Sequence, residues 1–132
     1  LHTAYRRQRQ MCIRDRPGDE DGGGMSAFVV FSQMGFYPVT PGSPTYNIGS
    51  PMFTDVKVDM GNGNTFEIRA NNASDENKYV QSAKLNGVTL NQPWFNHSDI
   101  AAGGLLELEM GPKANKEWGL GTPPPSAAPM PK

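Results

Sequence analysis

The chain has 132 residues, enough for one domain, and a formal net charge of −1, which excludes an overall basic footprint for nucleic acid. Fifteen glycines and twelve prolines are too many for a helical bundle and are typical of a turn-rich β protein. A single cysteine excludes an internal disulfide framework and a paired-cysteine metal site. The longest apolar run, residues 27–31, is far too short to span a membrane.

The first sixteen residues, LHTAYRRQRQMCIRDR, differ in composition from the rest of the chain. They hold five of the twelve basic residues and one of the thirteen acidic ones, so their net charge is +4 and that of the remainder is −5. One interpretation is a basic arm for nucleic acid or lipid headgroups. A second comes from back-translation, because residues 10–16 can be encoded by DNA that resembles the transposon end used in sequencing libraries. We therefore expect residues 1–16 to be translated adapter DNA that lies outside the folded core.

An acidic, glycine-rich turn at residues 17–24 leads into a predicted helix over residues 23–34. The stretch MSAFVVFSQM is followed by Gly35, typical of the residue after a helix, and by Pro38, which cannot continue one. Apolar residues fall on nearly every face of this helix, a pattern typical of a helix that is buried on all sides. A chain of this size cannot bury a helix so completely, which indicates that its packing partners are missing.

After the helix the apolar period changes to two, the period of strands. Gly61-Asn62-Gly63-Asn64 predicts a hairpin, and Asn86-Gly87 predicts a tight type I′ turn between two strands. Between the first two strands, Met52 and Phe53 are expected to lie in the core. The predicted strands are residues 45–48, 55–60, 65–70, 79–85, 88–90 and 105–110.

Together these elements predict an α+β fold class, with one apolar helix followed by an antiparallel, sandwich-like β module of five or six strands. The acidic turn and the helix occupy residues 17–37, and the β module occupies residues 38–118. Residues 119–132 are rich in proline and are expected to form an extended tail.

The cluster Asp19-Glu20-Asp21 is the only dense acidic group near the predicted start of the helix. Inverting hydrolysis of a glycoside needs one carboxyl group as proton donor and a second carboxylate that activates water. A glycine-flanked turn lets carboxylates approach a sugar ring closely, and a helix N-terminus keeps them ionised, as a general base requires. Two alternatives remain open. The acids cap the helix, or the Asp-x-Asp pair holds a metal for a nucleotide-sugar transferase.

Residues 18–39 are similar to a longer stretch of the form GDEDxGQMSAWYVFSxMGFYPV. The likeness then continues, in order, to Trp118. Its further positions are Pro41-Gly42-Ser43, Tyr46, Ile48-Gly49-Ser50-Pro51, Asn71-Asn72, Asn77, Tyr79, Gln81-Ser82-Ala83, Leu85-Asn86-Gly87, Trp94, His97, Asp99, Gly103-Gly104, 108–111 and Asn115-Lys116. By this collinear match the chain resembles glycoside hydrolase family 92, the calcium-dependent exo-α-mannosidases.

The resemblance implies the C-terminal end of a large, secreted or periplasmic bacterial enzyme with an (α/α)6-barrel catalytic domain. The family removes terminal α-linked mannose from glycans with inversion and uses calcium. In its motif the two aspartates of the GDED turn supply the general base, which implies Asp19 and Asp21 here, with Asp21 closer to the water and no such role for Glu20. The catalytic acid and most calcium ligands lie upstream in the family, so we expect no metal ligands in this chain and no activity without the missing domains.

Three positions depart from the family pattern. Gly24 stands where the family usually has Gln, which removes a polar contact near the site. Phe28 and Val29 replace a common Trp-Tyr pair. These departures leave the substrate preference open.

Two other functions remain open, a non-catalytic carbohydrate-binding β module of a secreted protein and a secreted structural β domain without a site. A binding module places aromatic side chains on an exposed face. Trp94, Phe95 and Trp118 are candidates for such a sugar platform, although aromatic residues of this kind more often pack in a core or between domains.

Overall fold

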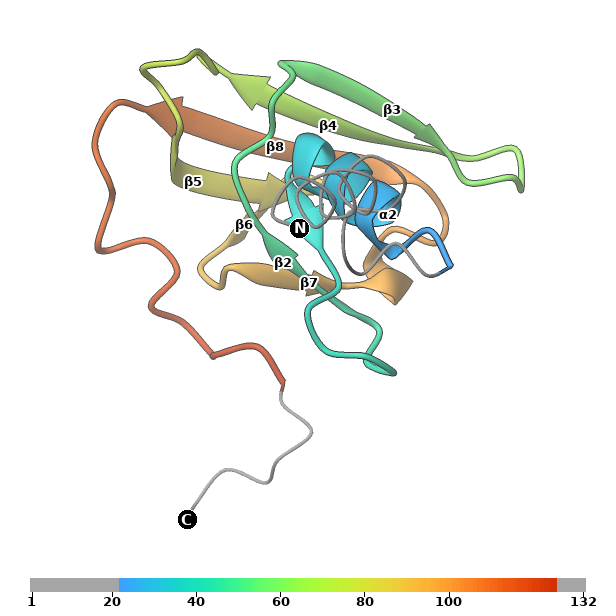
Figure 1. Ribbon diagram of the computed structural model, residues 1–132. Coiled ribbons are helices and arrows are strands. Elements are labelled where there is room, and N and C mark those ends of the chain that lie inside the picture. Colours follow the sequence, from blue (N-terminus) through green and yellow to red (C-terminus); the bar gives the residue numbers. More distant parts are fainter. Residues whose placement is uncertain (1–21, 126–132) are drawn as a thin grey trace, which may run out of the picture. The chain divides into compact units, whose positions relative to one another are not determined.

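The computed structural model in Figure 1 describes residues 22–125. The chain divides into two compact units, Leu1–Val30 and Phe31–Lys132, and the boundary falls inside the helix α2 (Gly24–Met34). The expectations for residues 1–16 and for the acidic turn up to residue 21 lie outside the described residues, as does the end of the tail from residue 126.

Backbone hydrogen bonds define both ends of α2. The N–H of Ala27 donates to the carbonyl of Gly23 at 3.0 Å, which is the first bond of the helix. At the other end the N–H of Gly35 donates to the carbonyl of Phe31 at 3.0 Å, and Gly35 has a φ of 89°, the left-handed conformation that commonly ends a helix. The predicted helix over residues 23–34 is confirmed.

None of the residues of α2 is fully buried. Phe28, Val29 and Val30 are about half exposed. A helix that is apolar on nearly every face is normally surrounded by protein.

The unit that begins at Phe31 contains two sheets (Figure 1). The smaller sheet is antiparallel, in the order β1-β2-β7, and the larger has the order β3-β4-β8-β5-β6. The strands of the smaller sheet are β1 (Phe36–Tyr37), β2 (Thr45–Ile48) and β7 (Trp94–Asn96). Those of the larger sheet are β3 (Asp55–Asp59), β4 (Thr65–Asn71), β5 (Tyr79–Leu85), β6 (Val88–Leu90) and β8 (Gly104–Gly111).

All six predicted strands are confirmed, three of them as β2, β5 and β6 with the same bounds. The short strands β1 and β7 were not predicted. One pairing corrects the expected antiparallel module, because β4 and β8 run parallel from Phe66↔Gly104 to Asn71↔Glu109. A parallel pair needs a long crossover, which here contains β5, β6, β7 and the short 3₁₀ helix η1 (His97–Asp99).

The predicted type I′ turn at Asn86-Gly87 is confirmed, because both residues have positive φ angles, 52° and 82°. The side chain of Asn86 also fixes the start of β8. Its Oδ1 accepts the N–H of Leu105 at 2.9 Å, and its Nδ2 donates to the carbonyl of Asp99 at 3.2 Å. A local hairpin turn therefore positions a strand that lies far away in the sequence.

The core lies between the two sheets and is centred on Phe36 of β1. The ring of Phe36 is 6.1 Å from that of Phe66 in the larger sheet and 5.7 Å from that of Phe95 in the smaller one. It also contacts Tyr46 edge-on at 5.2 Å, and Phe31 at the end of α2 at 5.4 Å. Such aromatic contacts add to the stabilisation from burying apolar area. The buried members of the core are Phe36, Phe66, Ile68, Ala70, Ala83, Leu85, Phe95, Ile100, Leu106, Leu108 and Met110.

After β8 the chain returns to the connection between β6 and β7. The indole N–H of Trp118 donates to the carbonyl of Leu90 at 2.9 Å, and that of Trp94 donates to the carbonyl of Thr122 at 2.8 Å. The first residues of the predicted tail are therefore held against the β6–β7 connection.

We predict that Gly35→Ala destabilises the chain more than Gly63→Ala. Both glycines have positive φ angles, 89° and 83°, so alanine costs about 1–2 kcal/mol of backbone strain at either position. Only at Gly35 would the added Cβ lie 2.8 Å from backbone and ring atoms of Pro51, whereas nothing lies within 4 Å at Gly63. Urea denaturation should show an additional loss of about 1–3 kcal/mol for Gly35→Ala. Equal losses would contradict the tight contact.

Candidate active-site segment

The predicted catalytic residues Asp19 and Asp21 lie outside the described residues. The first described part of this segment is Gly22-Gly23, with φ angles of 81° and 79°. Nothing lies within 4 Å of a Cβ built at either glycine. Glycine is therefore favoured here by the left-handed backbone conformation and not by close packing.

The start of α2 bears on the alternative that the acids only cap the helix. An acid can stabilise the start of a helix in two ways. Its side chain can cap the helix from the residue just before it, which is Gly23 here, or its charge can interact with the helix dipole from the first turn. Gly23 has no side chain, and the first turn of α2 contains no acidic residue. Asp21 precedes Gly23 by two positions, so the usual capping position is not available to it. Gly24, where the family usually has Gln, is the first residue of the helix.

A hollow of about 320 Å³ lies at the opposite end of α2, beside β1 and β2. None of the side chains around it carries a charge at neutral pH. The hydroxyl of Ser50, on its edge, donates to the carbonyl of Lys78 at 2.7 Å. The residues lining the hollow are Ser32, Gly35, Phe36, Tyr37, Asn47, Ile48, Gly49 and Ser50.

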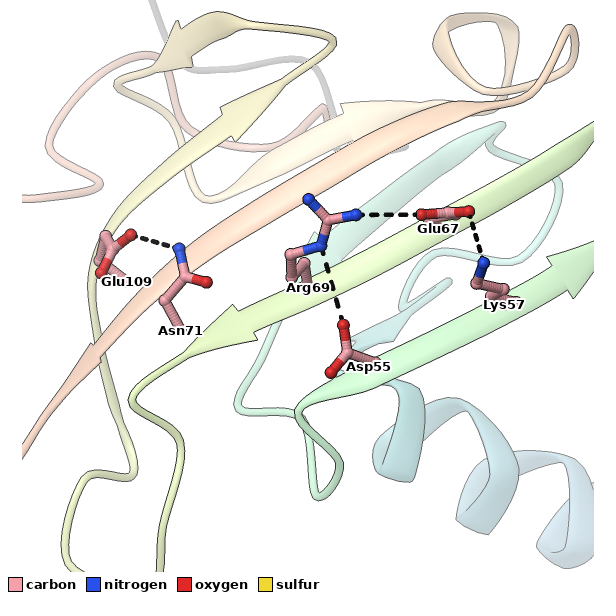
Figure 2. A network of polar contacts seen from close by, with 6 residues as sticks. All are labelled: Asp55, Lys57, Glu67, Arg69, Asn71 and Glu109. Carbon is pink, nitrogen blue, oxygen red and sulfur yellow. Dashed lines mark hydrogen bonds and ion pairs between the residues drawn. The ribbon is translucent and has the colours of Figure 1, made fainter.

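Figure 2 shows the main charged network of the described residues, on the outer face of the larger sheet. Lys57 pairs with Glu67 at 3.0 Å, and Arg69 pairs with Glu67 at 3.3 Å and with Asp55 at 3.7 Å. The hydrogen bond and the charge of Lys57, with a smaller contribution from Arg69, hold the pKa of the Glu67 carboxyl below its usual value of 4.5.

Opposite charges alternate across this face in a single row. Asp55 lies opposite Arg69, Arg69 opposite Glu107, and Glu107 opposite Lys84, across β3, β4, β8 and β5. Each acid in the row therefore has a basic cross-strand neighbour, which stabilises the sheet. The arrangement is suited to a solvated face, because it leaves no pair of carboxylates free for acid and base chemistry.

Among residues 22–125 we find no group of three or more His, Cys, Asp or Glu side chains placed to hold a metal ion. The described residues therefore offer calcium no such site. None of the helices in the described part of the chain has the length and apolar character needed to cross a membrane.

The aromatic residues considered for a sugar platform have structural roles. Phe95 is buried in the core between the sheets. Trp94 and Trp118 are partly buried, and their indole groups hold the returning C-terminal segment through backbone carbonyls. These placements favour packing over sugar binding, and they count against the alternative of a free-standing carbohydrate-binding module.

The expectation that Met52 and Phe53 lie in the core is wrong. Met52 is 68% exposed and Phe53 is 50% exposed, because the turn after β2 packs the buried Pro51 against Gly35 and leaves the next two side chains outside the core. Composition alone gave no signal for this arrangement. The hollow beside β1 and β2 was also not predicted, since its lining comes from three separate elements.

Residues 3–112 match the model of the glycosyl hydrolase family 92 catalytic domain. This chain belongs to glycosyl hydrolase family 92. The range that matches family 92 includes Asp19 and Asp21. It also includes most of residues 1–16, whose interpretation as adapter sequence stays a prediction.

Solved structures of family 92 share the fold of this chain. A family GH92 α-mannosidase from Bacteroides thetaiotaomicron is 38% identical, with a TM-score of 0.78 over 84% of this chain and 15% of that chain. A family GH92 inverting mannosidase from the same organism is 41% identical, with a TM-score of 0.70 over 77% of this chain and 14% of that chain. The predicted α+β fold class is thereby confirmed.

A curated relative from the fungus Arthroderma benhamiae is described as an uncharacterized secreted glycosidase. It is 39% identical over 108 residues, which are 80% of this chain and 14% of the relative. The chain thus spans about one seventh of the length of the relatives that it matches.

We predict that Lys57→Met raises the pKa of the Glu67 carboxyl toward its usual value, because the first cause of the lowered pKa is removed. A carboxyl group with a lowered pKa in the folded state stabilises the protein above its unfolded pKa, and this contribution is lost as the pH falls through the folded pKa. The melting temperatures of wild type and Lys57→Met should therefore differ near neutral pH and converge well below 4.5.

Lys84→Met is the matched control for this prediction, because Lys84 lies on the same face opposite Glu107. It removes the same charge without touching Glu67. A titration of the Glu67 side-chain carbon by NMR should be unchanged in this control. An unchanged pKa in Lys57→Met would refute the assignment.

Proposed function

We propose that this chain is the C-terminal part of a longer inverting exo-α-mannosidase, in which Asp19 and Asp21 supply the general base. The observation that carries the proposal is the collinear family match over residues 3–112, which includes the GDED turn. It is supported by relatives that are described as an α-mannosidase and as an inverting mannosidase.

Inversion requires a carboxylate that activates a water molecule on the face of the sugar opposite the leaving group. Asp21 takes the proton from this water, and Asp19 assists by tuning the proton affinity of the pair and orienting the water. The glycines that follow Asp21, at positions 22 and 23, adopt left-handed conformations. Glu20, between them, has no part in the reaction.

The substrates in this proposal are glycans that end in α-linked mannose, and the acid that protonates the leaving oxygen comes from the upstream part of the enzyme. We also propose that the longer enzyme binds calcium through residues outside this chain. The secreted relative supports a secreted location, and a periplasmic location is the alternative within this proposal.

We predict that Asp21→Asn in the full-length enzyme lowers turnover by about 10²–10⁴-fold, because an amide cannot take a proton from water at neutral pH. Asn is nearly isosteric with Asp, so the fold should be preserved. Asp19→Asn should also reduce turnover. Turnover of an aryl α-mannoside and the melting temperature should be measured together on each variant.

Glu20→Gln is the matched control, because it neutralises the acid between the two aspartates. It should leave turnover within a few fold of wild type. Near-normal turnover in both Asp19→Asn and Asp21→Asn would refute the catalytic assignment, even though family membership would stand.

A second prediction is that the 132-residue chain alone does not hydrolyse mannosides. Inverting enzymes place the acid and the base roughly 6.5–9.5 Å apart on opposite sides of the sugar, and the proposal places only the base in this chain. Incubation of the purified chain with an aryl α-mannoside and calcium should release no mannose. Release that disappears with Asp21→Asn would show that the chain is catalytically complete.

A further inference from the structure

Two exposed apolar side chains, Met52 and Phe53, follow closely in sequence the segment that lines the uncharged hollow at the end of α2. They come two and three residues after Ser50, which lines the hollow. We call these two side chains and the hollow the Met52–Phe53 surface. Isolated exposed apolar residues are common in soluble proteins, whereas exposed apolar residues that adjoin one another are typical of contact surfaces.

The backbone of this surface is fixed by the fold. The N–H of Met52 donates to the carbonyl of Gln33 at 3.0 Å, and Pro51 packs directly against Gly35. Ser50 is held by its hydrogen bond to the carbonyl of Lys78. The two side chains therefore project from an ordered turn, so that a partner would bind them without first having to order the chain.

The chemistry of the surface indicates what covers it. The residues lining the hollow carry no charge, whereas the outer face of the larger sheet carries Asp55, Lys57, Glu67 and Arg69. An apolar, uncharged surface is suited to permanent contact with protein, since burying it removes apolar area from water and leaves no charge unpaired.

The proposed occupant is argued from the greater length of the family member that this chain matches. The chain retains the fold of the Bacteroides α-mannosidase over 84% of its own length, yet it spans only 15% of that enzyme. We propose that the Met52–Phe53 surface docks onto an uncharged surface of the upstream part of the same enzyme. This inference rests on the proposed function only in assuming a longer enzyme, and it requires nothing of Asp19 or Asp21.

The test is the accessibility of a cysteine placed on the surface, in a background without other reactive cysteines and with Cys12→Ser. Met52→Cys and Phe53→Cys are compared with Val88→Cys on β6, where Val88 is 68% exposed, as Met52 is. Maleimide labelling rates are measured for the 132-residue chain and for the full-length enzyme. All three variants should label readily in the chain, since each replaces an exposed side chain with a small one.

In the full-length enzyme, labelling of Met52→Cys and Phe53→Cys should slow by at least about tenfold, which corresponds to about 1.4 kcal/mol of protection, while labelling of Val88→Cys stays unchanged.

Equal labelling rates in the 132-residue chain and in the full-length enzyme would overturn the proposal. Slow labelling in the chain that depends on its concentration would assign the surface to a second copy instead. Slow labelling only in the presence of mannose oligosaccharide would assign it to a glycan. Because the readout does not use turnover, normal activity of Asp21→Asn would not affect it.

Discussion

Phe36 contacts both sheets because the chain leaves α2 at Gly35 and passes directly against Pro51. The left-handed conformation of Gly35 and the absence of a side chain allow this approach, in which a Cβ would lie 2.8 Å from the proline. The next residue then reaches Phe66 on one sheet and Phe95 on the other. The same turn places the end of the helix, the core and the Met52–Phe53 surface in a fixed relation within the second unit.

Three regions of the chain differ in chemistry, and the difference is consistent with one part of a larger enzyme. The acidic turn before α2 carries the carboxylates that the proposed reaction needs. The outer face of the larger sheet neutralises its charges in cross-strand rows and is suited to water. The Met52–Phe53 surface is uncharged and apolar, and is suited to contact with another part of a protein. A free-standing sugar-binding module would instead expose aromatic rings, but Phe95 is buried and both tryptophans hold the C-terminal segment.

Local patterns predicted most of the fold. Alternation in β4 and β8 gave the strands and their buried faces, and Asn86-Gly87 gave the turn type. The parallel pairing of β4 with β8 was missed, because alternation carries no information about a partner more than thirty residues away. Strands β1 and β7 have two and three residues, too few for a period to be visible. The exposure of Met52 depends on Pro51 packing against Gly35, a tertiary contact that neither residue reveals alone. The role of Asp19 and Asp21 came from the family resemblance and remains a prediction.

The most direct test of the account is the configuration of the first product. The full-length enzyme should be incubated with an aryl α-mannoside and followed by proton NMR of the anomeric signals before mutarotation. A single displacement by water that is activated by Asp21 inverts the anomeric carbon, so β-mannose should appear first. Initial release of α-mannose would require a covalent intermediate and a carboxylate acting as nucleophile, and would contradict the role proposed for this acidic turn.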